Sequence, residues 1–295
     1  MRLGAHVSIR GALSLAIDRA VAIGCECLQI FVGSPRQWRL VPYTDEELER
    51  FSRKRRGTTL EPLVAHSVYL INLATSEIDL RQRSIAALTY AARIMDRLEG
   101  LATITHIGSR GQDSWPQALR RVATALTRTL EATDRSLILL ENSVGAGGQV
   151  GGTFEDLAAI LATLGWNRRV GICLDSAHLF AAGWDLRTAG DVDACVRAFD
   201  RIVGLRWLRA WHLNDAKSAL GSHIDRHENI GAGSIGRKGF AALLAHPALQ
   251  HLPAFIETPG FAHEGPDRKN LQILKRLRAT SSPLRRARRI HSRGR

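Results

Sequence analysis

The sequence predicts a single (β/α)8 TIM barrel, an α/β fold with a metal site at the C-terminal face of its strands. Three observations lead to this prediction. Eight short apolar segments recur along the chain, helix-like stretches separate them, and ionisable residues end several of the apolar segments. Strands that alternate with helical stretches indicate βαβ units and a parallel sheet. Eight such units favour a closed barrel over an open sheet.

Each apolar segment is short enough for one strand, and the segments mostly lie about 30 to 40 residues apart. In chain order they are MRLGAHVS (1–8), CLQIFVGS (27–34), PLVAHSVY (62–69), LATITHIGS (101–109), SLILLENS (136–143), VGICLDSAH (170–178), LRAWHLND (208–215) and PAFIETPG (253–260). Between the segments, apolar residues recur at helical spacing, which predicts the connecting helices. Such stretches are 12–24, 84–100, 118–134, 154–165 and 193–205.

Length and composition indicate one domain followed by a tail. The chain has 295 residues, of which 45% are hydrophobic, and α/β barrels reach this size as one unit. No apolar run approaches the roughly 20 residues that span a bilayer, and Met1 leads directly into the first apolar segment. We therefore expect a cytoplasmic protein without a membrane partner. The expected barrel domain covers 1–275, and the expected tail covers 276–295.

Most of the excess positive charge lies at the C-terminus. The formal net charge is +13. Nine basic residues lie from Lys275 onward, where the chain has no acidic residue, so the rest of the chain carries only +4. A basic tail of this kind is typically disordered and can hold a polyanion through phosphate contacts. A solvated tail without a dedicated partner is an equally open alternative.

The cysteines predict no metal site. Cys25, Cys27, Cys173 and Cys195 form no C-x-x-C pair, and the first two lie in an apolar run. Free cysteine is among the most buried residue types, so we expect reduced structural thiols.

Polar residues gather where the apolar segments end. Six segments end in a histidine, aspartate or glutamate: His66, His106, Glu141, Asp175, His212 and Glu257. The C-terminal ends of barrel strands meet at one face, and burying so many carboxylates and imidazoles there without a cation is costly. His178 follows three positions after Asp175, and Asp225 and His227 form a further pair.

These nine candidate ligands suit zinc, manganese or iron better than calcium or magnesium. They exceed what one ion can use and fit about three ions if some carboxylates bridge. Enzymes that hydrolyse phosphodiesters commonly use a site with several metal ions.

The motifs around these residues resemble those of the endonuclease IV family, the zinc-dependent apurinic/apyrimidinic endonucleases. The similar segments run in the family's order from residue 4 to about 260. They are GAHVS (4–8), RQW (36–38), HSVYLINL (66–73), LLENSVGAGGQVGGTFEDLA (139–158), LDSAHLFAAGWDLRT (174–188), HLNDAKSALGSHIDRHENIGAGSIG (212–236) and IETPG (256–260). One departure is HIGSRG (106–111), where many relatives have a proline after the histidine.

The resemblance implies a site with three zinc ions, with manganese possible in one or more positions. It assigns three sets of ligands, the first two sharing Glu141: His66, His106 and Glu141; Glu141, Asp175, His212 and Glu257; and His178, Asp225 and His227. The implied catalytic residues are Glu257, as an acid or base, and Glu141.

The implied reaction is hydrolysis of duplex DNA on the 5′ side of an abasic site, which leaves a 3′-hydroxyl, together with trimming of blocked 3′ ends. Arg36 and Tyr69 match family residues that enter the helix where a base is missing. Flipping out an abasic nucleotide costs less than flipping a normal one, and a planar side chain can fill the gap. The resemblance further implies a monomer that associates with the nucleoid through DNA.

Other interpretations remain at this stage. A sugar isomerase or epimerase on a related divalent-metal barrel is the main alternative, and a non-catalytic protein that binds DNA through its tail is another. GAGSIG (231–236) matches G-x-G-x-x-G formally, but it follows a charged loop rather than a strand, so we expect no nucleotide cofactor. We expect its glycines to allow close backbone approach, and Asp215 and Lys217 to order the loop or approach DNA phosphate.

Overall fold

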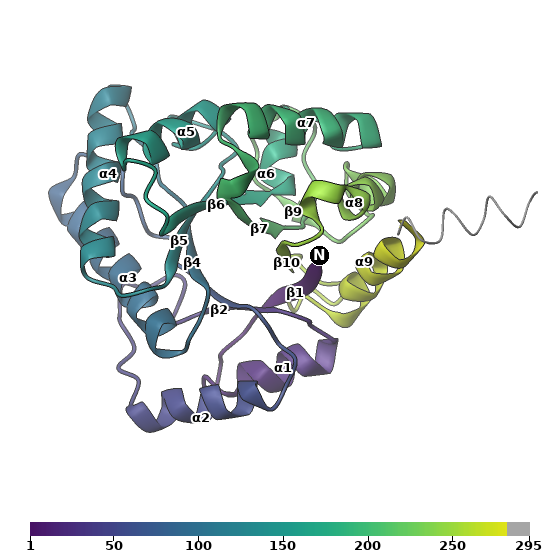
Figure 1. Cartoon of the computed structure of the whole chain (residues 1–295), viewed down its shortest axis with the longest axis horizontal. Helices are drawn as coiled ribbons and strands as arrows, with labels where there is room; N and C mark the ends of the chain where they lie inside the picture. Colours follow the sequence, from purple (N-terminus) through teal and green to yellow (C-terminus); the bar gives the residue numbers. More distant parts are fainter. Residues whose placement is uncertain (282–295) are drawn as a thin grey trace, which may run out of the picture.

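A computed structural model describes residues 1–281 and shows a closed barrel of eight parallel strands (Figure 1). The strands pair in the order β1, β10, β7, β6, β5, β4, β3, β2, and β2 pairs with β1. Their bounds are β1 (Arg2–Val7), β2 (Leu28–Phe31), β3 (Leu63–His66), β4 (Ala102–Thr105), β5 (Leu137–Glu141), β6 (Val170–Asp175), β7 (Leu208–His212) and β10 (Pro253–Ile256). The predicted TIM barrel is confirmed, and each predicted apolar segment supplies one strand.

Helices surround the barrel and connect successive strands (Figure 1). They are α1 (Leu15–Ile23), α2 (Asp45–Arg56), α3 (Ile78–Arg97), α4 (Trp115–Glu131), α5 (Phe154–Thr163), α6 (Ser176–Ala181), α7 (Ala189–Ile202), α8 (Gly236–Ala245) and α9 (Arg268–Ser281). Shorter elements are the 3-10 turns η1 (Leu205–Trp207) and η2 (Pro247–Leu249) and the hairpin of β8 (Asp215–Ala216) with β9 (His227–Glu228). None of the helices in residues 1–281 is long and apolar enough to cross a membrane.

Local sequence explains where several helices begin and end. α2 follows a capping box: the Thr44 hydroxyl accepts from the Glu47 backbone N–H, and the Glu47 carboxylate accepts from the Thr44 N–H. Thr153 and Thr188 cap α5 and α7 with the same kind of hydroxyl bond. α1 ends at Gly24, whose φ of 86° lies in the left-handed region that favours glycine.

The core has an outer layer and an inner layer. The outer layer packs the strands against the helices, and the smaller inner layer fills the barrel with Cys27, Val64, Ala102, Ile104, Leu139, Cys173, Ala210 and Phe255. All four cysteines are buried and free, as predicted. Burial raises the pKa of the Cys25 thiol to about 12, which keeps that thiol protonated and unreactive.

The last helix extends beyond the predicted domain boundary. We expected the tail to begin at residue 276, but α9 continues to Ser281. Its end is anchored on the barrel, because the Arg278 guanidinium donates two hydrogen bonds of 2.7 Å to the Glu26 carboxylate and one to the Met1 carbonyl. The basic composition alone suggests a tail here. The bidentate ion pair between Arg278 and Glu26 instead holds these residues in the helix. The rest of the predicted tail, 282–295, lies outside the described residues.

Replacing Glu26 by glutamine is expected to lower the melting temperature by about 2–5 °C near neutral pH, since charge-assisted hydrogen bonds contribute about 1–2 kcal/mol. Burial alone would raise the pKa of Glu26, but Arg278 outweighs it and lowers the pKa from 4.5 to about 2. The folded pKa is below the unfolded one, so the stabilisation is present above about pH 4.5 and is lost as the pH falls toward 2.

Thermal unfolding of wild type and Glu26→Gln at about pH 7, 4.5 and 3, which reaches into the window between the two pKa values, measures this effect. The matched control is Glu49→Gln, which removes an exposed i,i+4 pair with Arg53 on α2. Exposed pairs contribute little, so we expect the control to change stability less. Equal changes in the two variants would show that the Glu26 pair does not anchor α9.

Candidate metal centre

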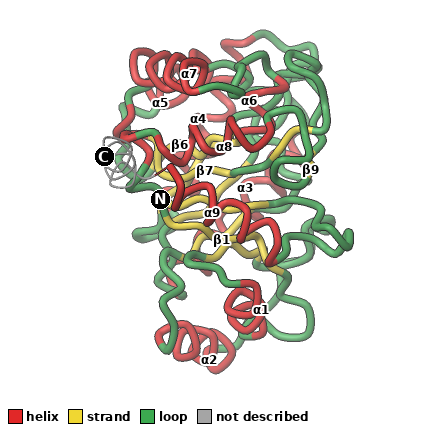
Figure 2. Tube along the Cα trace, turned by 90° about the vertical axis from the view of Figure 1, so that its right-hand side faces the viewer, coloured by secondary structure: helices red, strands yellow, loops and turns green. Residues whose placement is uncertain are grey.

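The six predicted strand-end residues all lie at one mouth of the barrel. β3, β5, β6 and β7 end at His66, Glu141, Asp175 and His212. His106 and Glu257 come directly after the last residues of β4 and β10. Because all eight strands are parallel, these side chains lie around the same opening, on the side of the barrel that also carries β9 (Figure 2).

A first group joins β3, β4 and β5. The Nε2 atoms of His66 and His106 each lie 3.0 Å from the same carboxylate oxygen, Oε2 of Glu141. The other ring nitrogen of His66 bonds to the Ser67 carbonyl at 2.8 Å. That bond fixes the ring so that Nε2 faces the group, which is the usual orientation of an imidazole that binds a metal.

A second group joins β5, β6, β7 and β10. His212 Nδ1 lies 2.8 Å from Oε1 of Glu141, 3.5 Å from Glu257 and 3.8 Å from Asp175. The ligand atoms of these four residues lie within 4.8 Å of one another. Glu141 thus offers Oε2 to the first group and Oε1 to the second, the arrangement of a bridging carboxylate.

A third group forms where α6 follows β6. It contains Asp175, His178 and His227. The Asp225 carboxylate lies against it, with one oxygen 3.3 Å from His178 Nε2 and the other 3.3 Å from His227 Nε2. The structure therefore places Asp175 beside both the second and the third group, whereas the sequence motif assigned it to the second alone. Asp225 reaches the group from the loop between β8 and β9, and His227 from the start of β9.

The electrostatics of the three groups favour bound cations. Burial alone would raise the pKa of Glu141 and of Glu257, but His212 beside them lowers both values well below the usual range. Burial alone would lower the pKa of His178, but Asp175 raises it well above its usual value. The carboxylates are thus ionised and require buried positive charge at the imidazoles. Divalent cations supply such charge, so this set of donors fits metal ions.

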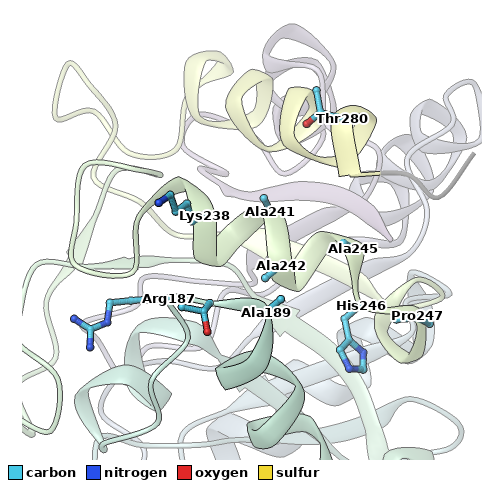
Figure 3. A pocket seen from close by; sticks show the side chains of 10 residues that line it. Arg187, Ala189, Lys238, Ala241, Ala242, Ala245, His246, Pro247 and Thr280 are labelled. Carbon is cyan, nitrogen blue, oxygen red and sulfur yellow. The ribbon is translucent and has the colours of Figure 1, made fainter. Parts of the chain in front are cut away.

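Two hollows near the barrel differ in chemistry. One, of about 360 Å³, opens beside the third group, and its walls include Tyr69, His106, His178 and Asp225. Another, of about 620 Å³, lies outside the barrel between α7, α8 and the end of α9 (Figure 3). Alanines of α8 dominate its walls, and no carboxylates converge there. Of the two, the smaller hollow adjoins the metal-binding groups, so it is the candidate for the substrate site.

Comparison with known proteins identifies the family. A family model described as xylose isomerase-like TIM barrel matches residues 17–278. A relative from Chloroflexus aggregans, named probable endonuclease 4, is 38% identical over 278 residues, covering 94% of this chain and 97% of the relative. The crystal structure of endonuclease IV from Thermus thermophilus is 33% identical, with a TM-score of 0.84, and covers 94% of this chain and 98% of its own. The chain belongs to the endonuclease IV family.

Family membership confirms the resemblance found in the motifs. A structure of a D-tagatose 3-epimerase-like protein also matches, with a TM-score of 0.72 over 95% of this chain and 98% of its own. Its sequence identity is only 18%, so this likeness shows a shared fold alone. The sugar epimerase alternative thus gains nothing from this likeness beyond a shared fold.

Sequence reasoning missed one residue that supports the second group of this endonuclease IV relative. Gln29 lies inside β2 and is fully buried. Its amide nitrogen donates to Oε1 of Glu257 at 2.6 Å, and its amide oxygen lies 2.9 Å from Nε2 of His212. His6 lies 3.1 Å from the same Glu257 oxygen. The sequence feature that could have indicated this role is a glutamine within an otherwise apolar strand.

Two asparagines were missed as well. The side chain of Asn142 accepts from the Asp175 N–H at 2.6 Å, and its carbonyl accepts from Nδ1 of His178 at 2.9 Å. The side chain of Asn214 donates to Asp175 at 2.6 Å and accepts from the Glu257 N–H at 2.7 Å. Each directly follows, or comes two positions after, a predicted ligand. These bonds hold the ligands in orientation, which in metal sites contributes to metal affinity and activity.

The loop after β7 is ordered by Asp215, as predicted. Asp215 is fully buried and accepts four backbone N–H bonds from the segment between Gly231 and Gly236. The prediction of close backbone approach is confirmed at Gly233, where a Cβ atom would lie 2.5 Å from the Ala216 carbonyl oxygen. Lys217, the other residue expected here, is exposed.

The loop after His106 is held without the proline that many relatives have there. Asn72 accepts from the Ser109 N–H at 3.1 Å and donates to the Ser109 carbonyl at 3.0 Å. Gly108 lets the two segments meet, because its φ is 101° and a Cβ atom there would lie 2.2 Å from the Asn72 side chain. A side-chain amide thus fixes the loop beside the first group.

The two residues expected to contact DNA lie on adjoining loops at the mouth. The Tyr69 side chain is half exposed, at 52%, which excludes a role as a core aromatic. Its ring packs against Phe31, with centroids 5.3 Å apart, and lies 6.1 Å from the His66 ring. The Tyr69 N–H donates to the Pro35 carbonyl at 3.0 Å, which ties its loop to the exposed Arg36.

Proposed function

We propose that this member of the endonuclease IV family is a DNA repair enzyme that hydrolyses the phosphodiester bond 5′ to abasic sites in duplex DNA. The products are a 3′-hydroxyl and a 5′-deoxyribose phosphate, and the same site trims blocked 3′ ends. The observation that carries the proposal is the convergence of nine ionisable side chains at one mouth, in three groups that share Glu141 and Asp175. With cations bound, such a centre would supply positive charge to both the attacked phosphate and the leaving oxygen.

The residues fit about three zinc ions, with manganese as an alternative in one or more positions. His66, His106 and Glu141 would hold the first, and Glu141, Asp175, His212 and Glu257 the second. His178, Asp225 and His227 would hold the third, with Asp175 beside them. When bound, these cations supply positive charge for the phosphoryl oxygens and lower the pKa of water.

Glu257 is the residue we assign to proton transfer, with Glu141 holding the first two groups together. Oε1 of Glu257 accepts from Gln29, which leaves Oε2 facing the centre near His212. Burial opposes ionisation of Glu257, but His212 and His6 outweigh it and lower its pKa, so the side chain is a carboxylate rather than a carboxylic acid. Gln29 and Asn214 hold the carboxylate and its backbone in place.

Arg36 and Tyr69 are the residues we assign to recognition of the lesion. An abasic nucleotide has lost its stacking, so its displacement from the helix costs little, and the two side chains can fill the space. We propose that the enzyme acts as a monomer on chromosomal DNA in the cytoplasm, with no nucleotide cofactor or membrane partner. The basic segment 282–295 would add phosphate contacts of no sequence preference.

Strand cleavage tests the proposal. The substrate is a duplex with one stable abasic analogue, and the control is the same duplex intact. We expect incision 5′ to the lesion only, loss of incision after a strong chelator, and recovery with zinc or manganese. Metal analysis should give about three ions per chain. Folded, metal-loaded protein that fails to incise would overturn the nuclease proposal and direct attention to sugar substrates.

A further inference from the structure

A further hollow, lined by arginine and tryptophan, lies at the opposite end of the barrel from the metal centre. It has a volume of about 500 Å³ and is lined by Trp166, Arg168, Arg206, Trp207 and Arg209. The first two precede β6, the next two belong to η1 just before β7, and Arg209 lies near the start of β7. Parallel strands begin at the face remote from the mouth. In Figure 2 that face lies on the side of the N-terminus, opposite β9.

The local backbone brings Arg209 to this hollow. The register between β6 and β7 shifts between Ile172 and Cys173, so that Arg209 has no partner in the ladder. Gly171 of β6 leaves room for its stem, since a Cβ atom at Gly171 would lie 2.7 Å from Cγ of Arg209. Arg209 stays exposed even though the rest of β7 is buried. A bulge and a glycine thus place a strand arginine at the barrel's N-terminal face.

The positive charge of the hollow is not neutralised by the described part of the chain. None of the ion pairs in residues 1–281 involves Arg168, Arg206 or Arg209. Arg206 lies over the Trp207 ring, 5.5 Å from its centroid, in a cation–π contact. Trp207 is 5% exposed, and its indole N–H has no hydrogen-bond partner among the described residues. Three guanidinium groups without acidic partners therefore form an anion-binding surface.

The aromatic rings indicate what kind of anion fits. The Trp166 and Trp207 rings lie 5.4 Å apart, and Trp166 is half-buried, so one ring borders the hollow beside the guanidinium groups. Arginines beside aromatic rings are typical of surfaces that bind single-stranded nucleic acid, where phosphates meet the charges and bases stack on the rings. A duplex keeps its bases inside and cannot offer them to a hollow of this shape.

We propose that this hollow is a second nucleic-acid site, which binds an unpaired strand at the N-terminal face of the barrel. Arg168 and Arg206 hold successive phosphates, Arg209 adds charge at the base of the hollow, and Trp166 stacks on one base. A duplex bound at the metal centre lies at the other end of the barrel, so the two sites bind separate segments. The proposal does not depend on the reaction at the metal centre.

Binding of labelled single-stranded DNA of about twelve nucleotides, a length that suits one such groove, tests the proposal. The variant is Arg168→Gln/Arg206→Gln. The matched control is Arg50→Gln/Arg53→Gln on α2, which removes the same charge from exposed arginines paired with Glu46 and Glu49. We expect the variant to bind about tenfold more weakly, and the slope of log affinity against log salt to fall by about 1.4. The control should stay near wild type.

A second variant, Trp166→Ala, should weaken binding about fivefold or more without changing the salt slope, since it removes stacking and not charge. Cleavage of an abasic duplex measured in parallel should be unchanged in both variants, which separates this site from the metal centre. Equal losses in the arginine variant and its control would overturn the proposal. Displacement of the strand by thymidine monophosphate at similar concentration would also overturn it, in favour of a small-molecule site.

Discussion

Glu257→Gln is expected to reduce cleavage of abasic duplex by about 10³-fold or more, while the fold is retained. Glutamine has the size of glutamate but carries no charge and accepts no proton at this position. The change therefore removes a proton acceptor and one carboxylate of the second group. It also places an amide against the Gln29 amide, which now donates to Oε1 of Glu257. Initial cleavage rates at saturating substrate, with metal content measured on the same samples, give the result.

The matched control is Glu264→Gln in the loop that follows, where the side chain is exposed. We expect it to cleave at the wild-type rate. If Glu257→Gln cleaves near the wild-type rate with all its metals bound, Glu257 has no part in the reaction. If it loses metal along with activity, Glu257 acts as a ligand, and proton transfer belongs to another group.

The residues at the strand ends could be predicted because the barrel imposes one rule on eight segments. A parallel strand presents its last residue at the mouth, so His66, Glu141 and Asp175 could be placed from sequence once eight βα units were recognised. The family motif then indicated which residues belong to each of the three ligand groups. The regular repeat of strand and helix along the chain is enough to place these residues, and no knowledge of side-chain packing is needed.

The residues that hold the predicted ligands in position could not be predicted in the same way. Gln29 bonds to Glu257 across 228 positions of sequence. A polar residue in an apolar strand does not reveal which partner it meets across β1, the strand that lies between β2 and β10. Asp175 likewise serves two groups only because β6 and α6 meet there, with its Oδ1 capping α6 at the His178 N–H. Such shared roles follow from three-dimensional packing rather than from motif order.

Composition alone did not show how far the last helix extends. The basic run from Lys275 suggests a solvated tail, yet Arg278 pairs with Glu26 and α9 continues to Ser281. Charge composition gives only the average charge of a segment. One acidic partner in contact with the segment can nevertheless order it. The hollow lined by Arg168 and Arg206 could not be recognised in the sequence either, because their loops come together only in the folded chain.

Tyr69→Ala is expected to lower the preference for abasic over intact duplex by about tenfold or more, with a small effect on stability. Stacking of a base on an aromatic ring contributes about 1–3 kcal/mol, and about 1.4 kcal/mol corresponds to a tenfold change in affinity. Half of the Tyr69 side chain is exposed at the mouth, so removing the ring leaves the core intact. Binding of both duplexes at one salt concentration gives the ratio.

Tyr69→Phe is the control, because it keeps the ring and loses only the hydroxyl. Burial raises the pKa of Tyr69 to about 12, so the hydroxyl is neutral at physiological pH and its loss changes no charge. We expect the phenylalanine variant to retain the preference. Arg36→Gln combined with Tyr69→Ala then tests whether the two loops act together: joined through Pro35, they should lose less in combination than the sum of the single losses. A fall in melting temperature with an unchanged preference would make Tyr69 a structural residue of the mouth and leave lesion recognition to other side chains.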